Sequence, residues 1–305
     1  METLKLGKSD LTSSRLIYGC MRIVGDNSNT SREKGKQAVL SAYQEGYTHF
    51  DHADIYGDGR CEELFSEVLK EMPEIRENIL ITSKCGIVKN NNPNPGDPFR
   101  YDFSKAYIIK SVEGSLSRIK IDTLDILLLH RPDYLFQAEE VGSAFEELKA
   151  SGKVRYFGVS NFIPSQLSLL QSFCPMPLIL NQIEINIYNI DTLLDGTLDQ
   201  CQELNITPQA WSPMKGVAYP ASDNTFSEET EARIKAEFNL QAQKYGTDHT
   251  TIMLSWLLIH PTKMTPIIGS TNPTRIQTAK QALDLDYTRE DWYRLFEARN
   301  GNPVP

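Results

Sequence analysis

Four side chains that could take part in proton transfer are spaced along the first half of the sequence: Asp51, Tyr56, Lys84 and His130. A tyrosine hydroxyl, with an ordinary pKa of about 10, is a weak proton donor at neutral pH. A nearby lysine ammonium would lower that pKa, and a carboxylate beside the lysine would keep the ammonium charged. A histidine can donate a hydrogen bond to a carbonyl oxygen that becomes negative in the transition state. Together these groups could deliver a proton to an alkoxide as a hydride reaches the carbonyl carbon.

None of these side chains supplies a hydride, so this chemistry requires a nicotinamide cofactor. Each residue taken alone also has an ordinary structural explanation. Asp51 could cap the turn that follows it, and Tyr56, which precedes Gly57, could pack within a loop. Lys84 could be a solvated loop lysine, and His130 could be a core histidine with its hydrogen bonds satisfied. The chemical interpretation therefore depends on whether the fold brings the four side chains together.

Eight short apolar runs separate amphipathic segments along the chain and predict strands. Between two of these runs, Val141, Ala144, Phe145 and Leu148 have the spacing of one helix face. Eight strand–helix units of about 30 residues predict an α/β fold, a (β/α)8 TIM barrel. A doubly wound sheet is the alternative, but the even repetition favours a closed barrel. The predicted strands are 16–19, 47–51, 79–83, 124–130, 154–159, 178–182, 207–211 and 264–268.

Two additions to the barrel are expected at the ends of the chain. The segment before Leu16 predicts an N-terminal β-hairpin that plugs the bottom of the barrel. Residues after about 287 predict an extra C-terminal helix, since Trp292, Leu295, Phe296 and Arg299 have helical spacing. Residues 90–98 and 218–227 are predicted loops, and no linker divides the chain. We therefore expect a single domain over residues 1–305.

In a (β/α)8 barrel the chemistry is carried by the loops at the carboxyl ends of the strands. The polar residues that end the predicted strands here would be costly inside an apolar barrel and are expected around a polar site. His49 and His52 form an HxxH pair, but alternate strand positions point to opposite faces, so no metal site is predicted. The strand-end residues are Asp51, Lys84, His130, Ser160, Asn161, Gln182, Trp211, Ser212, Gly269 and Ser270.

An anion site is predicted after the last strand. Gly269 allows a close backbone approach, and Asn272 is a good N-cap for a helix that starts at Pro273 and whose free N–H groups could face a phosphate. Ser270 and Arg275 could add a hydroxyl and a guanidinium. An ordinary capped helix with a surface arginine is the alternative. The segment 57–62 resembles a dinucleotide-binding glycine motif but lacks its third glycine, so it predicts a tight turn.

Charge and composition exclude several functional classes. The 305 residues include 40 acidic residues and 31 lysines and arginines, a net charge of −9, which argues against binding to nucleic acid or to an anionic membrane. No apolar run is long enough to cross a bilayer, and the N-terminus has no signal-peptide pattern. The five scattered cysteines predict reduced thiols. These features predict a cytoplasmic protein.

Seven stretches in order resemble the aldo-keto reductase family over nearly the whole chain, and Tyr18-Gly-Cys-Met-Arg22 is similar to bacterial members. The resemblance implies a (β/α)8 barrel that reduces carbonyl groups with NAD(P)H. It also implies that Tyr56 is the general acid, that Lys84 and Asp51 tune it and that His130 orients the carbonyl. The stretches are 50–57, 81–84, 127–132, 152–162, 181–182, 211–213 and 269–275.

The resemblance also assigns cofactor contacts. It implies that Ser160, Asn161 and Gln182 hold the nicotinamide carboxamide, and that Trp211, in place of a commoner tyrosine or phenylalanine, stacks on the nicotinamide ring. It implies that Ser212 through Lys215 and Gly216 border the pyrophosphate. Ser270 and Arg275 would bind a 2′-phosphate, which favours NADPH over NADH. Thr278 and Ala279 depart from the family's adenine-binding pattern.

The substrate is expected to be a small carbonyl compound that meets variable loops. Candidate pocket residues are Met21, Arg22 and Tyr134, with Phe99, Tyr101 and the 218–227 loop. Arg22 could favour an acidic substrate, contact the cofactor or face solvent, and Arg131 and Asp133 are expected to form a local turn. Other hypotheses are a cofactor-sensing binding module, or a metal-dependent barrel enzyme for which only Asp51 and His130 could be ligands. The sequence does not distinguish a monomer from a dimer.

Overall fold

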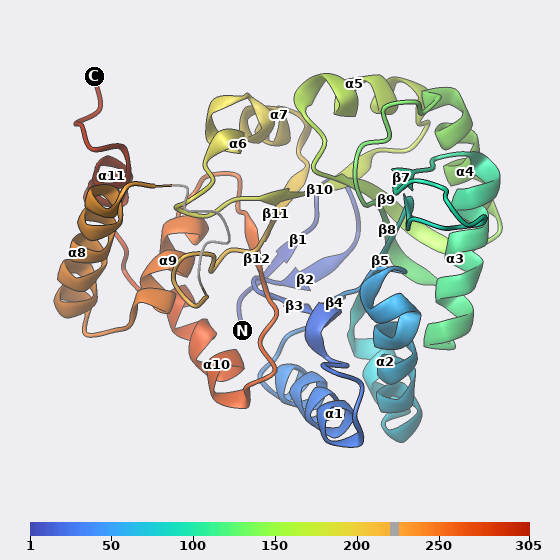
Figure 1. The fold of residues 1–305 in the computed structure, drawn as a ribbon, viewed down its shortest axis with the longest axis horizontal. Helices are drawn as coiled ribbons and strands as arrows, with labels where there is room; N and C mark the ends of the chain where they lie inside the picture. The colour runs from blue at the N-terminus through green and yellow to red at the C-terminus, as the bar shows by residue number, and fades with distance from the viewer. Residues whose placement is uncertain (220–225) are drawn as a thin grey trace.

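The computed structural model describes residues 1–219 and 226–305, and its centre is a closed barrel of eight parallel strands (Figure 1). Neighbouring strands follow the order of the chain, and the last strand pairs with the first through Ile267–Ile17 and Ile268–Tyr18. This closure confirms the barrel and excludes the doubly wound sheet. The strands are β3 (Ile17–Gly19), β4 (His49–Asp51), β5 (Leu80–Cys85), β8 (Leu124–Leu129), β9 (Val154–Ser160), β10 (Leu178–Glu184), β11 (Thr207–Trp211) and β12 (Thr265–Ile268).

Helices surround the barrel, and the predicted apolar face of α4 is buried. In α4 the buried residues include Val141, Ala144, Phe145 and Leu148, as their spacing predicts. The helices are α1 (Asn29–Gln44), α2 (Arg60–Glu71), α3 (Lys105–Ile119), α4 (Ala138–Ala150), α5 (Pro164–Phe173), α6 (Asp191–Leu194), α7 (Thr197–Leu204), α8 (Glu228–Tyr245), α9 (His249–Leu258), α10 (Pro273–Thr278) and α11 (Arg289–Asn300).

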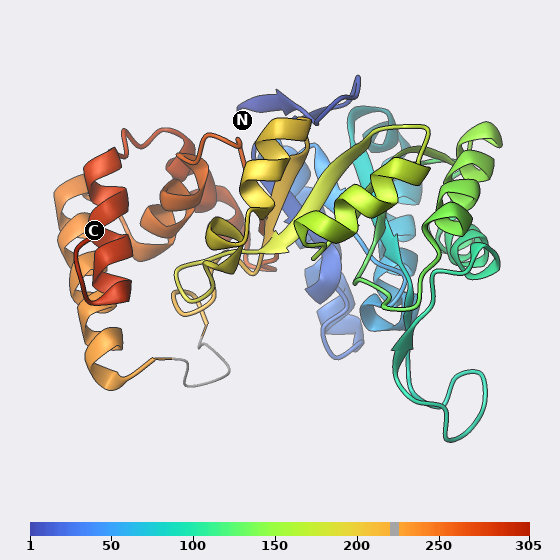
Figure 2. The ribbon, with the colours of Figure 1, turned by 90° about the horizontal axis from the view of Figure 1, so that it is seen from above.

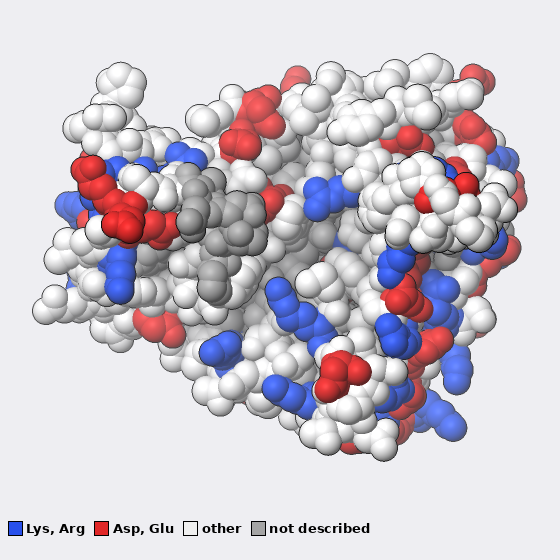
Figure 3. Space-filling view, in the orientation of Figure 1, with Lys and Arg blue, Asp and Glu red and all other residues white. Residues whose placement is uncertain are grey.

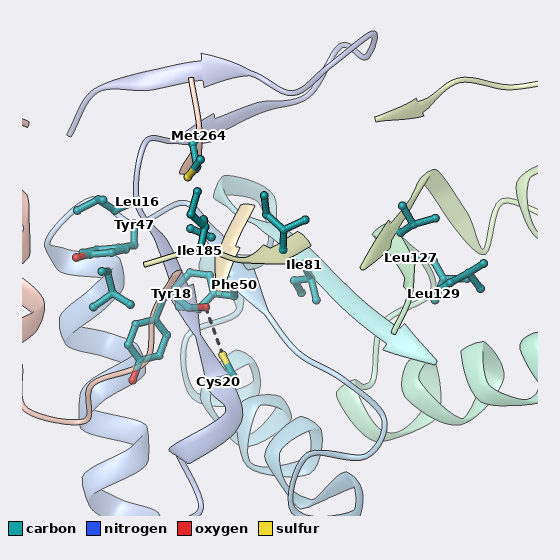
Figure 4. Packing of buried hydrophobic residues seen from close by; sticks show 14 of the residues in the cluster. Leu16, Tyr18, Cys20, Tyr47, Phe50, Ile81, Leu127, Leu129, Ile185 and Met264 are labelled. Atoms are coloured by element: carbon teal, nitrogen blue, oxygen red, sulfur yellow. Dashed lines mark hydrogen bonds between the residues drawn. The ribbon is translucent and has the colours of Figure 1, made fainter. Parts of the chain in front are cut away.

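The barrel strands are apolar because both of their faces are covered. All six residues of β8 are buried, which explains why its sequence is nearly continuous in apolar character. Phe157 of β9 stacks on Phe145 of α4 with ring centroids 4.2 Å apart. On the opposite side of the barrel, Tyr18 meets Phe50 edge to face at 5.8 Å (Figure 4). This packing holds the strand ends in place.

A hairpin of β1 (Thr3–Lys5) and β2 (Thr12–Ser14) lies across one end of the barrel (Figure 2). Its turn inserts Leu6 and Leu11, both buried, into a cluster formed by β5, β8 and β10 residues. The predicted N-terminal plug is therefore present. The 90–98 segment projects beyond the other end of the barrel in the same view, so the two barrel ends differ.

The structure adds one element that the sequence did not predict. β6 (Ile87–Val88) and β7 (Arg100–Tyr101) form a second hairpin whose connection contains the 90–98 loop. Each strand has only two residues, too few for a period-two pattern to be recognised.

The predicted C-terminal helix is α11, which packs beside α8 at one side of the molecule (Figure 1). Trp292 of α11 stacks on Trp256 of α9 with ring centroids 5.0 Å apart, and the indole N–H of each donates to the main-chain carbonyl of the other. The pair of helices α8 and α11 thus contacts the rest of the barrel through α9.

Candidate active site

The buried Lys84 ammonium is the centre of the site at the carboxyl ends of β4 and β5. Its Nζ donates to Asp51 Oδ2 at 2.7 Å, to the Tyr56 hydroxyl oxygen at 3.0 Å and to the His52 carbonyl at 2.8 Å. Asp51 ends β4 and lies beside β5, which carries Lys84. An ammonium has three hydrogens and no lone pair, so these contacts use its full capacity. The Tyr56 oxygen accepts from Lys84, and its own proton is left for another partner.

A tight turn places Tyr56 over this lysine. Gly57 and Gly59 have φ values of 56° and 85°, in the left-handed region that glycine adopts without strain. The two glycines therefore form a tight turn. This is the structure predicted for segment 57–62, which lacks the third glycine of a dinucleotide-binding motif. Behind it, Glu62 accepts from Arg118 Nε at 2.7 Å and from the Ser83 hydroxyl at 2.6 Å. These bonds tie the start of α2 to the strand residue before Lys84.

His130, directly after β8, faces Tyr56 edge to face with ring centroids 5.8 Å apart. Its Nδ1 is buried and has no hydrogen-bond partner among the described residues. Burial, with the positive charges of Lys84 and Arg131, lowers the pKa of His130 well below its ordinary value. The imidazole is therefore neutral at physiological pH and keeps one N–H that can donate to a ligand.

Burial and the Lys84 charge shift the pKa of Tyr56 in opposite directions. Burial raises this pKa, and the Lys84 charge lowers it, as the residue types predict. The effect of burial is the larger one, so the pKa of Tyr56 lies above its ordinary value in the free enzyme. Burial also lowers the pKa of Lys84, but Asp51 and Tyr56 outweigh it and raise that pKa overall. The site thus holds a phenol beside an ammonium.

The residues assigned to the nicotinamide form a hydrogen-bonded network around Asn161. Asn161 Nδ2 donates to Ser160 Oγ at 2.8 Å, and its Oδ1 accepts from the Trp211 indole at 2.9 Å. Gln182 Nε2 donates to Asp51 Oδ1 at 2.9 Å, which connects this network to the lysine cluster. Asn161 has a φ of 61°, in the left-handed region where asparagine is enriched, directly after β9. The structure therefore brings the four predicted residues together beside Asp51.

Gln209 is a site residue that the sequence reasoning missed. Its Oε1 accepts from Gln182 Nε2 at 3.1 Å, and its own Nε2 is buried without a partner in the described part of the chain. Gln209 lies two positions before Trp211 on β11. A polar residue that faces inward on a barrel strand is the sequence feature that could have identified it.

The loop after β11 carries Ser212, Lys215 and Gly216. Ser212 has a φ of 49°, a left-handed conformation that is strained for serine. Lys215 Nζ lies 3.3 Å from Glu184 Oε1. Gly216 has a φ of 79°, and a Cβ at that position would lie 1.7 Å from the Tyr188 ring, so only glycine fits. The loop therefore has a defined backbone at the mouth of the barrel.

The loop after β12 differs from the expected helix N-terminal site. Asn272 is the N-cap, as predicted, but its Oδ1 accepts from the N–H groups of both Thr274 and Arg275. These two N–H groups therefore donate to the cap, so they are not the free N–H groups that the sequence predicts. Ser270 Oγ accepts from the Asn272 N–H at 3.1 Å. The Arg275 guanidinium is exposed, and no carboxylate of the described residues lies within 4.0 Å of it.

Arg22 lies on this same side of the mouth. Its Nη1 is 3.0 Å from the position that a Cβ on Gly269 would take, and its guanidinium lies 5.5 Å from the centre of the Tyr219 ring. Gly269 thus leaves room for an arginine from the loop after β3. Arg22, Lys215 and Arg275 belong to the segments after β3, β11 and β12, which are neighbouring strands of the barrel.

The predicted pocket residues lie in the segments that follow β3, β5 and β8. Tyr134 is 85% exposed, and Met21 is 48% exposed. Phe99 and Tyr101 meet edge to face at 6.1 Å. Of the 218–227 loop, residues 220–225 lie outside the described residues. Figure 3 shows that this face is hollow at its centre, with lysine and arginine side chains at the edge of the hollow.

Arg131 lies in a bend before Pro132, and Asp133 begins the turn that follows, in which its carbonyl accepts from the Phe136 N–H at 3.3 Å. Asp133 accepts from the N–H groups of Phe103 and Leu135, at 3.1 Å and 2.9 Å. The Arg131 guanidinium lies over the Trp211 ring, 5.0 Å from its centre.

The HxxH histidines are held separately. His49 pairs through its two ring nitrogens with the hydroxyls of Ser13 and Thr82, at 3.0 Å and 2.7 Å, and His52 packs against Phe65. Within 1–219 and 226–305, no three His, Cys, Asp or Glu side chains gather as metal ligands. None of the helices described has the length and apolar character that a membrane crossing requires.

Comparison with known proteins agrees with this geometry. An uncharacterised oxidoreductase of Bacillus subtilis is 40% identical over all of both chains. A 6-dehydroglucose reductase of Agrobacterium fabrum is 38% identical over 96% of this chain and 97% of its own. The crystal structure of a thermostable aldo-keto reductase, Tm1743, matches with a TM-score of 0.82 and 27% identity over 98% of this chain and all of its own. The family model "Aldo/keto reductase family" matches residues 15–300, so the chain belongs to this family of NAD(P)H-dependent oxidoreductases that act on carbonyl compounds.

Proposed function

We propose that this enzyme reduces the carbonyl group of an aldehyde or ketone to an alcohol, with NADPH as the cofactor and Tyr56 as the proton donor. The observation that carries the proposal is the Lys84 ammonium, which bridges Asp51 and the Tyr56 hydroxyl while the His130 ring faces the Tyr56 ring. NADPH supplies the hydride when it is bound. The protein side chains orient the carbonyl and handle the proton.

Tyr56 gives its hydroxyl proton to the substrate oxygen as negative charge develops there. The hydroxyl is protonated in the free enzyme because burial holds the Tyr56 pKa above its ordinary value. Once the proton leaves, the Lys84 ammonium at 3.0 Å stabilises the phenolate. Asp51 keeps that ammonium aimed, and Gln182 holds the other Asp51 oxygen.

His130 is proposed to donate its remaining N–H to the same substrate oxygen. A neutral imidazole suits this role, since it polarises the carbonyl without competing as an acid with Tyr56. The T-shaped contact of the two rings, with centroids 5.8 Å apart, supports a shared role for these two side chains. Asn161, Ser160 and Gln182 would hold the carboxamide of the nicotinamide, and Trp211 would contact its ring.

The first test is turnover by the purified enzyme. We expect consumption of NADPH when short aldehydes are added, with the matching alcohol as product. The oxidation of NADPH without carbonyl substrate is the background to subtract. Tight NADPH binding with no turnover on any aldehyde or ketone would contradict the proposal and would favour a cofactor-sensing protein.

The preference for NADPH is proposed from Arg275, an exposed guanidinium with no described acidic partner. Arg275→Met should raise KM for NADPH about tenfold through loss of a charge-assisted hydrogen bond, which solvent partly screens. KM for NADH should change by less than about twofold, since NADH has no 2′-phosphate. Steady-state kinetics with both cofactors measure this. Equal changes for the two cofactors would show that Arg275 does not recognise the 2′-phosphate.

A further inference from the structure

Arg131 is a cation at the mouth of the barrel that the proposed mechanism does not use. It directly follows His130, and its side chain is half-buried. Its guanidinium lies face-on to Trp211, 5.0 Å from the ring centre. Across residues 1–219 and 226–305, no carboxylate lies within 4.0 Å of this guanidinium.

The position of Arg131 is held by a defined network. The Trp211 indole donates to Asn161 Oδ1 at 2.9 Å, so the ring beneath the guanidinium cannot turn freely. Asn161 Nδ2 also reaches the His130 carbonyl at 3.4 Å, beside the backbone of Arg131. An aromatic face holds a guanidinium through cation–π attraction and leaves the N–H groups at its edge unpaired. Those edge donors match the two oxygens of a carboxylate or phosphate.

The electrostatics of the site favour an anionic partner. A partly buried charge is costly when nothing compensates it. Asp133, the nearest acidic residue in sequence, is occupied by two backbone N–H groups. The Arg131 charge also helps to lower the pKa of the neighbouring His130, after burial and Lys84. An anion bound at Arg131 would therefore compensate the positive charge of a guanidinium that has no carboxylate partner among the described residues.

Arg22, the other arginine considered for the substrate, has a different place. It lies against Gly269 and Tyr219, on the side where the β12 loop carries Ser270 and Arg275. Arg131 instead is adjacent in sequence to His130, whose ring faces Tyr56. The two arginines thus lie at different parts of the mouth, and the Arg131 guanidinium lies over Trp211.

We propose that Arg131 determines substrate specificity by binding a carboxylate or phosphate group on the carbonyl compound. This inference rests on the proposed reduction reaction and names the substrate class of the same site. The Arg131 guanidinium lies over Trp211, the ring proposed to contact the nicotinamide, so only a short linker would separate a bound anionic group from the carbonyl. The preferred substrates are therefore short aldehydes or ketones that carry a negative charge.

Matched substrates test the proposal. Succinic semialdehyde and butanal share a four-carbon aldehyde skeleton, but only the first carries a carboxylate. In Arg131→Met, kcat/KM for succinic semialdehyde should fall about ten- to a hundredfold, the value of a hydrogen bond to a charged group. The value for butanal should change by less than about twofold. Most of the loss should be in KM, because the contact is remote from the transferred hydride.

Three controls make the result specific. Arg289→Met removes an exposed arginine of α11 and should leave both substrates unchanged. Arg131→Lys keeps the charge and should recover part of the lost affinity. The third control compares kcat/KM for glyceraldehyde phosphate and glyceraldehyde. A loss for the phosphate alone shows that Arg131 binds phosphate, whereas an equal loss for both shows an effect that does not depend on the phosphate.

Equal losses for succinic semialdehyde and butanal would overturn the proposal and assign Arg131 to support of Trp211. A carboxylate-specific loss combined with equal losses for glyceraldehyde and its phosphate would support the proposal and assign Arg131 to carboxylates alone. Calorimetry gives a readout independent of turnover: the hydroxy acid derived from succinic semialdehyde should bind the NADP-loaded enzyme and lose affinity in Arg131→Met. An enzyme that binds this acid through Arg131 but reduces no carbonyl would contradict the proposed function and leave the anion site standing.

Discussion

Tyr56→Phe should reduce kcat/KM for every carbonyl substrate by about 10²- to 10⁴-fold, the usual contribution of a positioned general acid. The substitution removes only the hydroxyl, and the ring can keep its contact with His130. NADPH affinity should be unchanged, because no cofactor contact is proposed for Tyr56. Single-turnover kinetics and fluorescence titration with NADPH measure the two quantities separately.

The matched control is Tyr293→Phe, which removes a tyrosine hydroxyl from α11, remote from the barrel mouth. It should retain parental activity. A Tyr56→Phe enzyme with unchanged kcat/KM would show that another group, or water, delivers the proton. The pH profile adds a second check: since burial raises the pKa of Tyr56, reduction should stay constant through neutral pH and decline only when alkaline pH removes the proton.

The barrel could be predicted because its strands obey a simple physical rule. A parallel strand covered on both faces is apolar throughout, and the six buried residues of β8 show this directly. The loops between such strands then place polar residues at one rim, which is why Asp51, Lys84 and His130 could be selected before any geometry was known. Their convergence on Tyr56 follows from the pairing of β4, β5 and β8.

Other features depend on contacts that sequence spacing does not reveal. Arg131 lies over Trp211, which is distant in the chain, because the ends of β8 and β11 meet at one mouth. The Asn272 cap was recognised, but only the structure shows that it occupies the N–H groups expected to meet a phosphate. The direction of the Tyr56 pKa shift depends on burial, which the residue types alone do not give.

Removal of the Lys84 ammonium should damage both stability and catalysis. Lys84→Met leaves the buried Asp51 carboxylate with Gln182 as its remaining side-chain donor. Breaking a buried ion pair from one side costs about 3–5 kcal/mol of unfolding free energy. Reduction should be lost as well, because the Tyr56 phenolate would have no neighbouring cation. Urea unfolding and kcat measurements test the two effects.

A double variant separates the two losses. In Lys84→Met/Asp51→Asn the uncompensated carboxylate is gone, so much of the stability should return, whereas the proton-transfer function should not. Lys153→Met breaks a solvent-exposed pair with Glu113 and should cost about 1 kcal/mol or less. Recovery of activity together with stability in the double variant would mean that Lys84 serves only the fold. We expect the double variant to regain stability but not activity. A neutral pair can satisfy the packing, but only the Lys84 ammonium can stabilise the Tyr56 phenolate.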